Sequence, residues 1–248
     1  MIHNLAQVGQ GATSKIYRDG KIAIKLYENI LYEDVVREAS KQKFAYNAGL
    51  PVPAILDIQQ LEGKSVALHM EYIKAQPLMH VGMDKDDRRA AIETLVKLQC
   101  DIHKIPAIGL PKQNETLHRR LTQSEYLAET EKEQLITLLK KLTTDENNLC
   151  HGDFHPLNIL YDGSKHWIID WVDATAGNCL ADTCRSYLIF KQYIARMAGI
   201  YLRAFCKEAK VKQEDVLAWL PIIAAGRLIE NLDEKSRTWL LEIIRGNL

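Results

Sequence analysis

Hydrophobic residues make up 47% and charged residues 26% of the 248-residue chain, the composition of a globular protein with a sizeable core. Its 32 lysines and arginines balance 32 aspartates and glutamates, so a formal net charge of +0 gives no field that favours nucleic acid or an anionic membrane. The chain has five cysteines without a Cys-x-x-Cys pair, and it has neither an apolar run of membrane length nor a signal-peptide pattern at Met1–Asn4. We therefore expect a cytoplasmic protein with neither nucleic-acid nor membrane partners.

The first segments indicate strands around a glycine-containing loop. Gly9, Gly11 and Ser14 lie in this loop, and a strand over residues 21–27 carries Lys25 between apolar residues. Glycines let backbone N–H groups approach phosphate oxygens, and a fixed lysine adds a positive charge there. Because the glycines lie between strands and not before a helix, a dinucleotide fingerprint or a P-loop is disfavoured. A plain hairpin turn is the alternative interpretation.

Residues 32–48 have the apolar spacing of a helix that ends at Gly49. By analogy with the strand-lysine and helix-glutamate pair of kinases, Glu38 in this helix is the expected partner of Lys25. The alternative is that Glu38 is one of several solvated helix charges.

Strands over residues 54–58 and 65–71 complete the N-terminal part. The chain leaves the sheet around Glu71 and Ile73, where the backbone of a linker between two lobes could pair with a nucleotide base. An ordinary strand end is the alternative. We place the boundary here, with an N-terminal nucleotide-binding lobe over residues 1–73 and a C-terminal catalytic and substrate-binding lobe over residues 74–248.

The rest of the chain is predicted to be mostly helical. Apolar spacing and helix breakers predict helices over residues 84–105, 115–142 (one or two helices), 180–209 (with a break near Gly199), 213–232 (kinked or split at Pro221) and 234–245.

The most specific motif runs from His151 to Asn158. It puts Asp153 two residues after the histidine and five before the asparagine. This is the order of a phosphotransfer catalytic loop, in which the aspartate accepts the proton of the attacking hydroxyl and the asparagine holds a metal ion. Two short strands joined at Asp162-Gly163 would bring Asp170 back beside Asn158. These two side chains could then share a magnesium ion with phosphate and water.

Other interpretations of this segment remain open. Loop residues of these types often only cap turns. A metal-dependent hydrolase would use His151, Asp153, His155 and Asp170 as ligands of a first-row metal, but it leaves Lys25 without a role. A non-catalytic nucleotide-binding protein is a further alternative, and the complete set of catalytic residue types argues against it.

Taken together, these motifs resemble the aminoglycoside phosphotransferase and choline kinase-like family, which is related to protein kinases. The resemblance covers nearly the whole chain and is carried by His-Gly-Asp-Phe-His-Pro-Leu-Asn-Ile-Leu at residues 151–160 and Ile-Asp-Trp at residues 169–171. It implies an α+β, two-lobed protein kinase-like fold, with a small antiparallel sheet and one main helix in the N-lobe and a larger, mostly helical C-lobe. It also implies a small-molecule kinase that uses ATP or GTP and magnesium to O-phosphorylate a hydroxyl of an aminoglycoside, amino alcohol or sugar.

The resemblance further implies roles for individual residues. Asp153 would be the catalytic base, and Asn158 and Asp170 would hold the metal. Lys25 would bind the α- and β-phosphates and Glu38 would orient it. The nucleotide site would comprise Gly9, Gly11, Ser14, Lys25, Glu38 and, through their backbone groups, Glu71 and Ile73.

The resemblance also implies structural roles for three residues and shows where the chain differs from protein kinases. His151 and His103 would be structural, and Asp182 would steady the catalytic loop. Gly152 stands where protein kinases have an arginine, and Trp171 follows Asp170 in place of Phe-Gly, so protein substrates are disfavoured.

Four acidic residues lie in segments expected to border the acceptor site: Asp173, Glu230, Asp233 and Glu234. Together they could attract an amine-bearing acceptor. Solvated helix ends are the favoured alternative for the last three. Arg227 would contact a substrate anion or pair with one of these acids.

Overall fold

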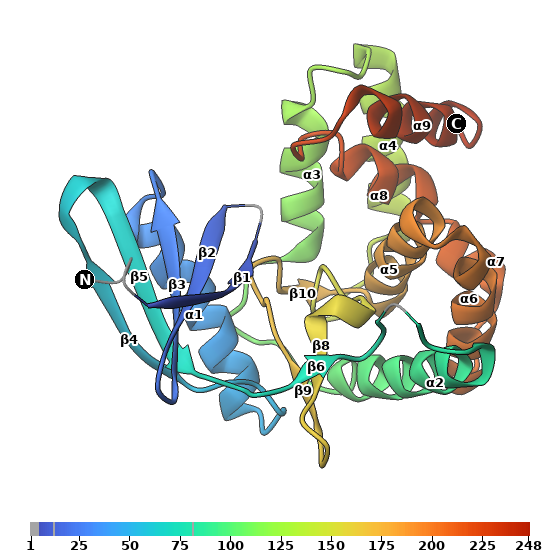
Figure 1. Cartoon of the computed structure of the whole chain (residues 1–248). Coiled ribbons are helices and arrows are strands. Elements are labelled where there is room, and N and C mark those ends of the chain that lie inside the picture. The colour runs from blue at the N-terminus through green and yellow to red at the C-terminus, as the bar shows by residue number, and fades with distance from the viewer. Residues whose placement is uncertain (1–4, 12, 81) are drawn as a thin grey trace. The chain divides into compact units, whose positions relative to one another are not determined.

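A computed structural model of the chain describes residues 5–11, 13–80 and 82–248. Residues 1–4, on which the expectation of no signal peptide rests, lie outside these ranges. Packing divides the chain into two compact units (Figure 1). Unit 1 comprises Met1–Val81 and Pro156–Asp173, and unit 2 comprises Gly82–His155 and Ala174–Leu248. The lobes over residues 1–73 and 74–248 stay a prediction; the packing units differ from them mainly because the segment Pro156–Asp173 groups with unit 1.

Unit 1 is built on a five-stranded antiparallel sheet (Figure 1). The strands, in spatial order, are β1 (Ala6–Gln10), β2 (Ser14–Asp19), β3 (Ile22–Glu28), β5 (Ser65–Glu71) and β4 (Ile55–Gln60). The β2–β3 hairpin turns at Gly20, whose φ of 58° is in the left-handed region that the Asp-Gly signal predicts. A short 3-10 turn, η2 (Glu62–Lys64), joins β4 to β5.

Helix α1 (Tyr32–Asn47) packs on one face of this sheet. Val35 and Ala39 of the helix contact Tyr27, Val66 and Leu68 of β3 and β5, all of them buried. Alternation along the strands gives the other face its own apolar cluster, which includes Ile24 and Leu26. Residue 25 therefore lies on the α1 side of the central strand β3.

A second, three-stranded sheet in unit 1 carries the predicted hairpin. Its strands are β6 (Gln76–Pro77), β8 (Ile159–Tyr161) and β9 (His166–Ile168), and the 3-10 turn η3 (Pro156–Asn158) precedes β8. Ile159 is paired with Ile168, and the Ile169 N–H donates to the Asn158 carbonyl at 3.0 Å. The hairpin thus returns the chain to Asn158 one residue before Asp170.

Unit 2 is mostly helical (Figure 1). Its helices are α2 (Lys85–Ile102), α3 (Gln113–Gln123), α4 (Glu129–Leu142), α5 (Cys179–Tyr193), α6 (Ala195–Ala209), α7 (Gln213–Leu217), α8 (Leu220–Gly226) and α9 (Glu234–Arg245). A two-stranded ladder of β7 (Asn148–Cys150) and β10 (Thr175–Gly177) completes the unit. The predicted α+β organisation is confirmed.

One helix break was predicted at the wrong residue. The chain breaks at Ile194, which has non-helical φ and ψ of −141° and 61°, and Gly199 lies inside α6. A glycine inside a helix costs only about 1 kcal/mol relative to alanine, which the buried apolar face of α6 offsets. The split near Pro221 is as predicted, with the proline in the first turn of α8, where no backbone donor is lost.

Two further expectations concern the whole chain. All five cysteines are free thiols, as predicted. Within the described ranges, every helix is too short or too polar to cross a bilayer.

Candidate functional site

Lys25 of unit 1 lies between two carboxylates. Its Nζ is 2.7 Å from Glu38 Oε1 and 3.3 Å from Asp170 Oδ1. The lysine and Glu38 side chains are only 13% and 6% exposed, whereas Asp170 is 39% exposed. Burial lowers the pKa of Lys25, but the charges of Asp170 and Glu38 outweigh this effect and raise the pKa above its ordinary value. Lys25 is therefore a fixed cation at neutral pH.

The local fold explains this pairing. Lys25 is on the face of β3 that α1 covers, and Glu38 lies on the buried face of α1 next to Ala39. A buried carboxylate is tolerated only when it is paired, so the ion pair and the apolar packing of α1 support one another. The structure thus brings together the lysine and glutamate that the sequence analysis paired.

Asp170 follows β9 in an unusual conformation. Its φ is 65°, in the left-handed region that few non-glycine residues adopt and that aspartate tolerates better than most. Its carboxylate reaches Lys25, and Asn158, which precedes the first strand at the same open end of the hairpin, is 7% exposed. Carboxylate and amide oxygens suit magnesium, so the residue types at this hairpin end fit the predicted ion.

The glycine loop is tighter than the sequence indicated. Gly9 is already part of β1, where it pairs with Ile16 after a bulge. The Gly11 N–H donates to the Ser14 carbonyl at 2.8 Å, and a Cβ on Gly11 would lie 3.0 Å from Ser14 Oγ. Ser14 itself is buried at the start of β2. A larger residue at position 11 would therefore require the Ser14 hydroxyl to shift.

Glu71 and Ile73 lie at the end of β5 and just beyond it. The Glu71 N–H donates to the Ala54 carbonyl at 2.9 Å, and the next N–H, of Tyr72, donates to Lys21. Any backbone contribution of Glu71 to base binding would therefore come from its carbonyl.

Asp153 lies in the loop of unit 2 that follows β7. Its Oδ2 is 3.3 Å from His155 Nε2 and its Oδ1 is 3.6 Å from an Arg185 nitrogen. Burial would raise the pKa of Asp153, but the hydrogen bond from His155 and the positive charge of Arg185 lower it below its ordinary value. Asp153 is therefore an ionised carboxylate, a proton and hydrogen-bond acceptor.

Buried polar contacts hold the catalytic loop. The Gly152 N–H donates to Asp182 Oδ1 at 2.7 Å, and His103 Nε2 lies 2.9 Å from Asp182 Oδ2. His151 is fully buried, and its Nδ1 accepts the Asp153 N–H at 3.2 Å. Gly152 has a φ of 82°, so the residue in the position of the protein-kinase arginine is in a conformation that favours glycine. These contacts agree with the structural roles expected for His151, His103 and Asp182.

The same contacts weaken the hydrolase alternative. The His151 ring is buried with its edge against Phe154 and one nitrogen bonded to the loop backbone, and His155 pairs with Asp153. Across residues 5–11, 13–80 and 82–248, no group of three or more His, Cys, Asp or Glu side chains is arranged to hold a metal.

Arg185 was missed by the sequence analysis, although it links Asp153 to Glu230. Arg185 Nη1 lies 2.8 Å from Glu230 Oε1, and Arg227 Nε lies 3.0 Å from Glu230 Oε2. Arg120 of α3 approaches the same carboxylate at 3.9 Å. Helical spacing offers one signal for Arg185, which is one turn after Asp182 on α5.

Glu230 is therefore paired, and the alternative that it is a solvated helix end is wrong. Arg227 pairs with Glu230, which agrees with the alternative that this arginine pairs with one of the acids. Asp233 caps α9 by accepting the Ser236 N–H at 2.7 Å, and Glu234 is exposed in the first turn of that helix. The expectation that these three acids attract an amine-bearing acceptor loses its support.

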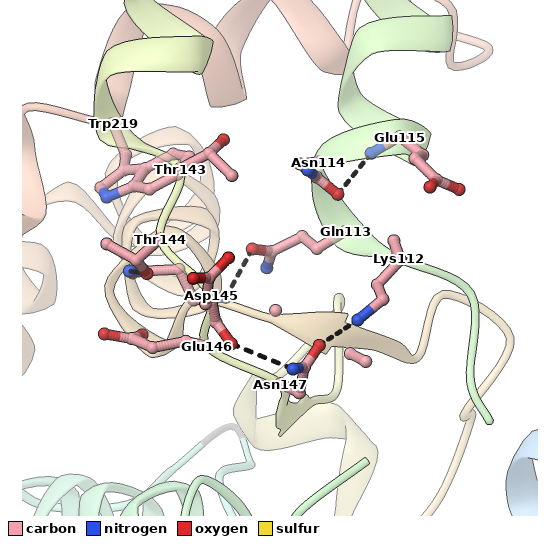
Figure 2. A pocket seen from close by; sticks show the side chains of 13 residues that line it. Lys112, Gln113, Asn114, Glu115, Thr143, Thr144, Asp145, Glu146, Asn147 and Trp219 are labelled. Carbon is pink, nitrogen blue, oxygen red and sulfur yellow. Dashed lines mark hydrogen bonds between the residues drawn. The ribbon is translucent and has the colours of Figure 1, made fainter. Parts of the chain in front are cut away.

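A separate pocket of about 440 Å³ lies within unit 2, between the start of α3, the end of α4 and β10 (Figure 2). Figure 2 shows Gln113 extending from α3 toward β10, where its Oε1 accepts the Asn178 N–H at 3.0 Å, and Lys112 bonded to Asn147. Asn178 Oδ1 in turn caps α5. None of the predicted site residues lines this pocket, and its wall supports the helix that carries Asp182 and Arg185.

Several solved structures share the fold. Aminoglycoside phosphotransferase APH(4)-Ia, in a thermostable mutant with ADP and hygromycin B, has a TM-score of 0.72 at 15% identity over 98% of this chain and 92% of that chain. The GDP complex of a mutant aminoglycoside 2′-phosphotransferase-IIIa has a TM-score of 0.67 at 15% identity, covering 100% and 92%. Amicoumacin kinase hAmiN in complex with AMP-PNP, Ca²⁺ and Ami also has a TM-score of 0.67, at 12% identity, covering 100% of this chain and 88% of that chain. These likenesses confirm the predicted two-lobed kinase-like fold.

Among curated protein sequences, none is significantly similar to this chain. The model of the phosphotransferase enzyme family, in contrast, matches residues 5–220. The match includes the glycine loop, Lys25 and the complete catalytic motif, and it confirms the prediction of a small-molecule kinase. The chain therefore belongs to the phosphotransferase enzyme family of the aminoglycoside phosphotransferases.

Proposed function

We propose that this enzyme transfers the γ-phosphoryl group of ATP to a hydroxyl of a small molecule, with Asp153 as the base. The observation that carries the proposal is the cation of Lys25, fixed between Glu38 and Asp170 at 2.7 and 3.3 Å. A lysine held in this way is a point charge prepared for phosphate oxygens. The same carboxylate of Asp170 belongs to the hairpin end whose residue types suit a metal ion.

Unit 1 supplies the groups for the nucleotide. Lys25 would contact the α- and β-phosphates, with Glu38 keeping its ammonium group in place. The glycine loop at Gly9, Gly11 and Ser14 would approach the phosphates closely, because its glycines carry no side chain. The carbonyl of Glu71 and the N–H of Ile73 would pair with the base. ADP or AMP-PNP is bound in two of the similar structures and GDP in a third, so ATP is the preferred donor and GTP the alternative.

Magnesium fits the oxygen donors of Asn158 and Asp170, which would hold it. When bound, the ion would offset the negative charge of the transferring phosphoryl group. Both side chains belong to one short hairpin whose ladder fixes their spacing. Their metal role is thus a proposal built on residue type and hairpin register.

Asp153 would orient the acceptor hydroxyl and take up its proton. Its pKa is lowered, so the carboxylate is fully ionised but only weakly basic. Such a group suits a reaction in which the proton leaves late, because the transition state of phosphoryl transfer depends mainly on positioning and charge stabilisation. The buried hydrogen bonds to Asp182 and His151 would keep this carboxylate aimed at the acceptor.

The acceptor is a hydroxyl-bearing small molecule, with aminoglycosides, amino alcohols and sugars as the classes expected from the sequence. Hygromycin B and amicoumacin accompany two of the similar proteins. We further propose that the enzyme acts in the cytoplasm without nucleic-acid or membrane partners, in keeping with its balanced charge and free thiols.

A thermal-shift titration tests the proposal. Stabilisation by ATP that requires magnesium and is reversed by EDTA is the expected result. Stabilisation by zinc alone, with no response to magnesium and ATP, would contradict it and favour the metal-dependent hydrolase.

A further inference from the structure

The pocket between α3, α4 and β10 is large enough to hold a small molecule (Figure 2). Its volume of about 440 Å³ is in the range of ligand-binding cavities, roughly 300 to 1,000 Å³. Most ligand cavities are lined mainly by apolar side chains. The described residues that line this one are polar, except for Ala176, Gly177 and Trp219. A matching ligand would therefore be a polar molecule, held mainly by hydrogen bonds and charge.

Gln113 presents a hydrogen-bond donor to this pocket. Its side chain is 9% exposed, and Figure 2 shows the amide reaching into the space between α3 and the segment 143–147. The Oε1 atom accepts the Asn178 N–H, so the other end of the amide is the NH2 group. Within the described part of the chain, this NH2 group has no hydrogen-bond partner. Because donors of largely buried side chains are rarely left unbonded, it indicates a ligand with an acceptor oxygen.

The fold holds this amide in place from two sides. A Cβ on Gly177 of β10 would collide with Gln113 Cβ and would lie 2.5 Å from Gln113 Oε1, so a larger residue at position 177 would displace Gln113. Asn178, the next residue, bonds the amide through its N–H and caps α5 by accepting the N–H groups of Leu180 and Ala181. Gln113 is thus a preorganised contact for a ligand.

Three carboxylates give the pocket a negative rim. Glu115 on α3 and Asp145 and Glu146 on the segment before β7 line it and are exposed. Across residues 5–11, 13–80 and 82–248, their side chains form no ion pair or hydrogen bond. Lys112, which also lines the pocket, is bonded to Asn147. The rim therefore favours an ammonium group, whereas the buried amide favours an oxygen of the same ligand.

We propose that this pocket is a second small-molecule site, which binds a protonated amine that also carries hydroxyl or ether oxygens. The ammonium group lies at Asp145 and Glu146, and a ligand oxygen accepts the NH2 group of Gln113. Amino sugars and amino alcohols combine these groups. The lining residues include none of the residues proposed for catalysis, metal or nucleotide, so this site goes beyond the proposed function and does not depend on it.

Calorimetric titration of the whole protein without nucleotide tests the ligand class. Glucosamine, glucose and glucuronate share one ring and differ in charge. At low ionic strength, we expect glucosamine to bind about fivefold or more tightly than glucose and glucuronate to bind most weakly, because each exposed carboxylate contributes modestly. Equal affinities, tighter binding of glucuronate or no binding of glucosamine would overturn the proposal.

Matched double variants connect this preference to the pocket. Asp145→Asn combined with Glu146→Gln should remove most of the preference for glucosamine over glucose. Glu214→Gln combined with Asp215→Asn makes the same charge change at an exposed pair in the first turn of α7, outside the pocket, and should keep the preference. The same preference in both double variants would refute the assignment.

Gln113→Met tests the amide separately, because methionine keeps the length of the side chain and removes the donor. The comparison uses glucosamine and cyclohexylamine, which has a six-membered ring and an amine but no oxygens. The ratio of their affinities should fall about threefold or more in the variant, the effect of one lost hydrogen bond. An unchanged ratio in a variant that remains folded by thermal denaturation would contradict a ligand contact at Gln113.

Asp153→Asn distinguishes this pocket from the acceptor site. Glucosamine should bind this variant within about twofold of the wild type, because Asp153 does not line the pocket. A large loss of glucosamine binding would place the amine at the proposed base and overturn the second site. Failure of Mg-ATP to stabilise the wild type would instead count against the proposed function alone, so the two failures are distinguishable.

Discussion

The two units arrange charge in opposite ways around their candidate site residues. In unit 1 a single lysine lies between two carboxylates, those of Glu38 and Asp170. In unit 2 three arginines converge on the single carboxylate of Glu230, and one of them continues to Asp153. Paired carboxylates suit a divalent cation, whereas the guanidinium groups of unit 2 already hold the carboxylate of Glu230.

Distance along the chain does not distinguish the two arrangements. Lys25 and Asp170 are 145 residues apart, whereas Arg185 and Glu230 are 45 residues apart. The difference is that Lys25, Glu38 and Asp170 lie in motifs that the sequence indicates, whereas the arginines of unit 2 lie in helices without such a motif.

The largest effect is expected for Asp153→Asn. This change keeps the shape of the side chain but removes the proton acceptor, so turnover should fall by roughly a hundredfold or more. ADP release measures turnover, and the Mg-ATP thermal shift should be preserved because the nucleotide groups belong to unit 1. Unchanged turnover would remove Asp153 from the mechanism.

A smaller effect, about tenfold in nucleotide affinity or turnover, is expected for Lys25→Ala, which removes the cation beside the phosphates. Lys104→Ala is its control, because Lys104 pairs with Asp101 at the same 2.7 Å but is exposed and lies outside the site. Calorimetric titration with Mg-ATP measures affinity. Equal affinities of Lys25→Ala and Lys104→Ala would show that Lys25 does not contact the nucleotide.

The catalytic-loop support gives a pH-dependent prediction. Burial opposes ionisation of Asp182, but hydrogen bonds from His103 and Gly152 lower its pKa below the unfolded value of about 4. A lowered folded pKa contributes stability that is present above about pH 4 and is lost as the pH falls toward the folded pKa.

Asp182→Asn should therefore lower the free energy of unfolding at pH 7 by about 1 to 3 kcal/mol and flatten its fall below about pH 4. Chemical denaturation between about pH 2.5 and pH 7 measures both effects. The same steep acid limb in the variant and the wild type would assign the pH dependence to other carboxylates.

The smallest effect compares a glycine of each unit. Gly152 and Gly20 have φ of 82° and 58°, so alanine at either position should cost about 1 kcal/mol of stability. Only Gly152→Ala should also reduce turnover, because it shifts the loop that carries Asp153. Thermal denaturation and ADP release measure the two effects. An equal loss of turnover in both variants would contradict the expectation that turnover depends on the conformation of Gly152.

Local sequence signals predicted most of the fold. The Asp19-Gly20 turn, the Gly49 stop and the Asp162-Gly163 turn give correct positions for the hairpins and for α1, because each acts within a few residues. The break at Ile194 was not predictable in this way, because isoleucine is not a helix-breaking residue type.

The candidate site residues that lie in sequence motifs were predictable, whereas the contacts between helices were not. Lys25, Glu38, Asp153 and Asp170 belong to motifs with fixed spacing, so their residue types alone indicated the chemistry. Arg185 and its contact with Glu230 join residues 45 positions apart. Helical periodicity predicts which face of a helix is apolar, but it does not predict which charged residues of distant helices meet.

The most direct test of the central claim is the binding of ATP to the wild type and to Asp170→Asn, with and without magnesium, by calorimetry. We predict that magnesium strengthens ATP binding to the wild type and that this strengthening is largely lost in Asp170→Asn, while Asp162→Asn, in the exposed turn of the same hairpin, retains it. The same magnesium dependence in Asp170→Asn and the wild type would contradict the account.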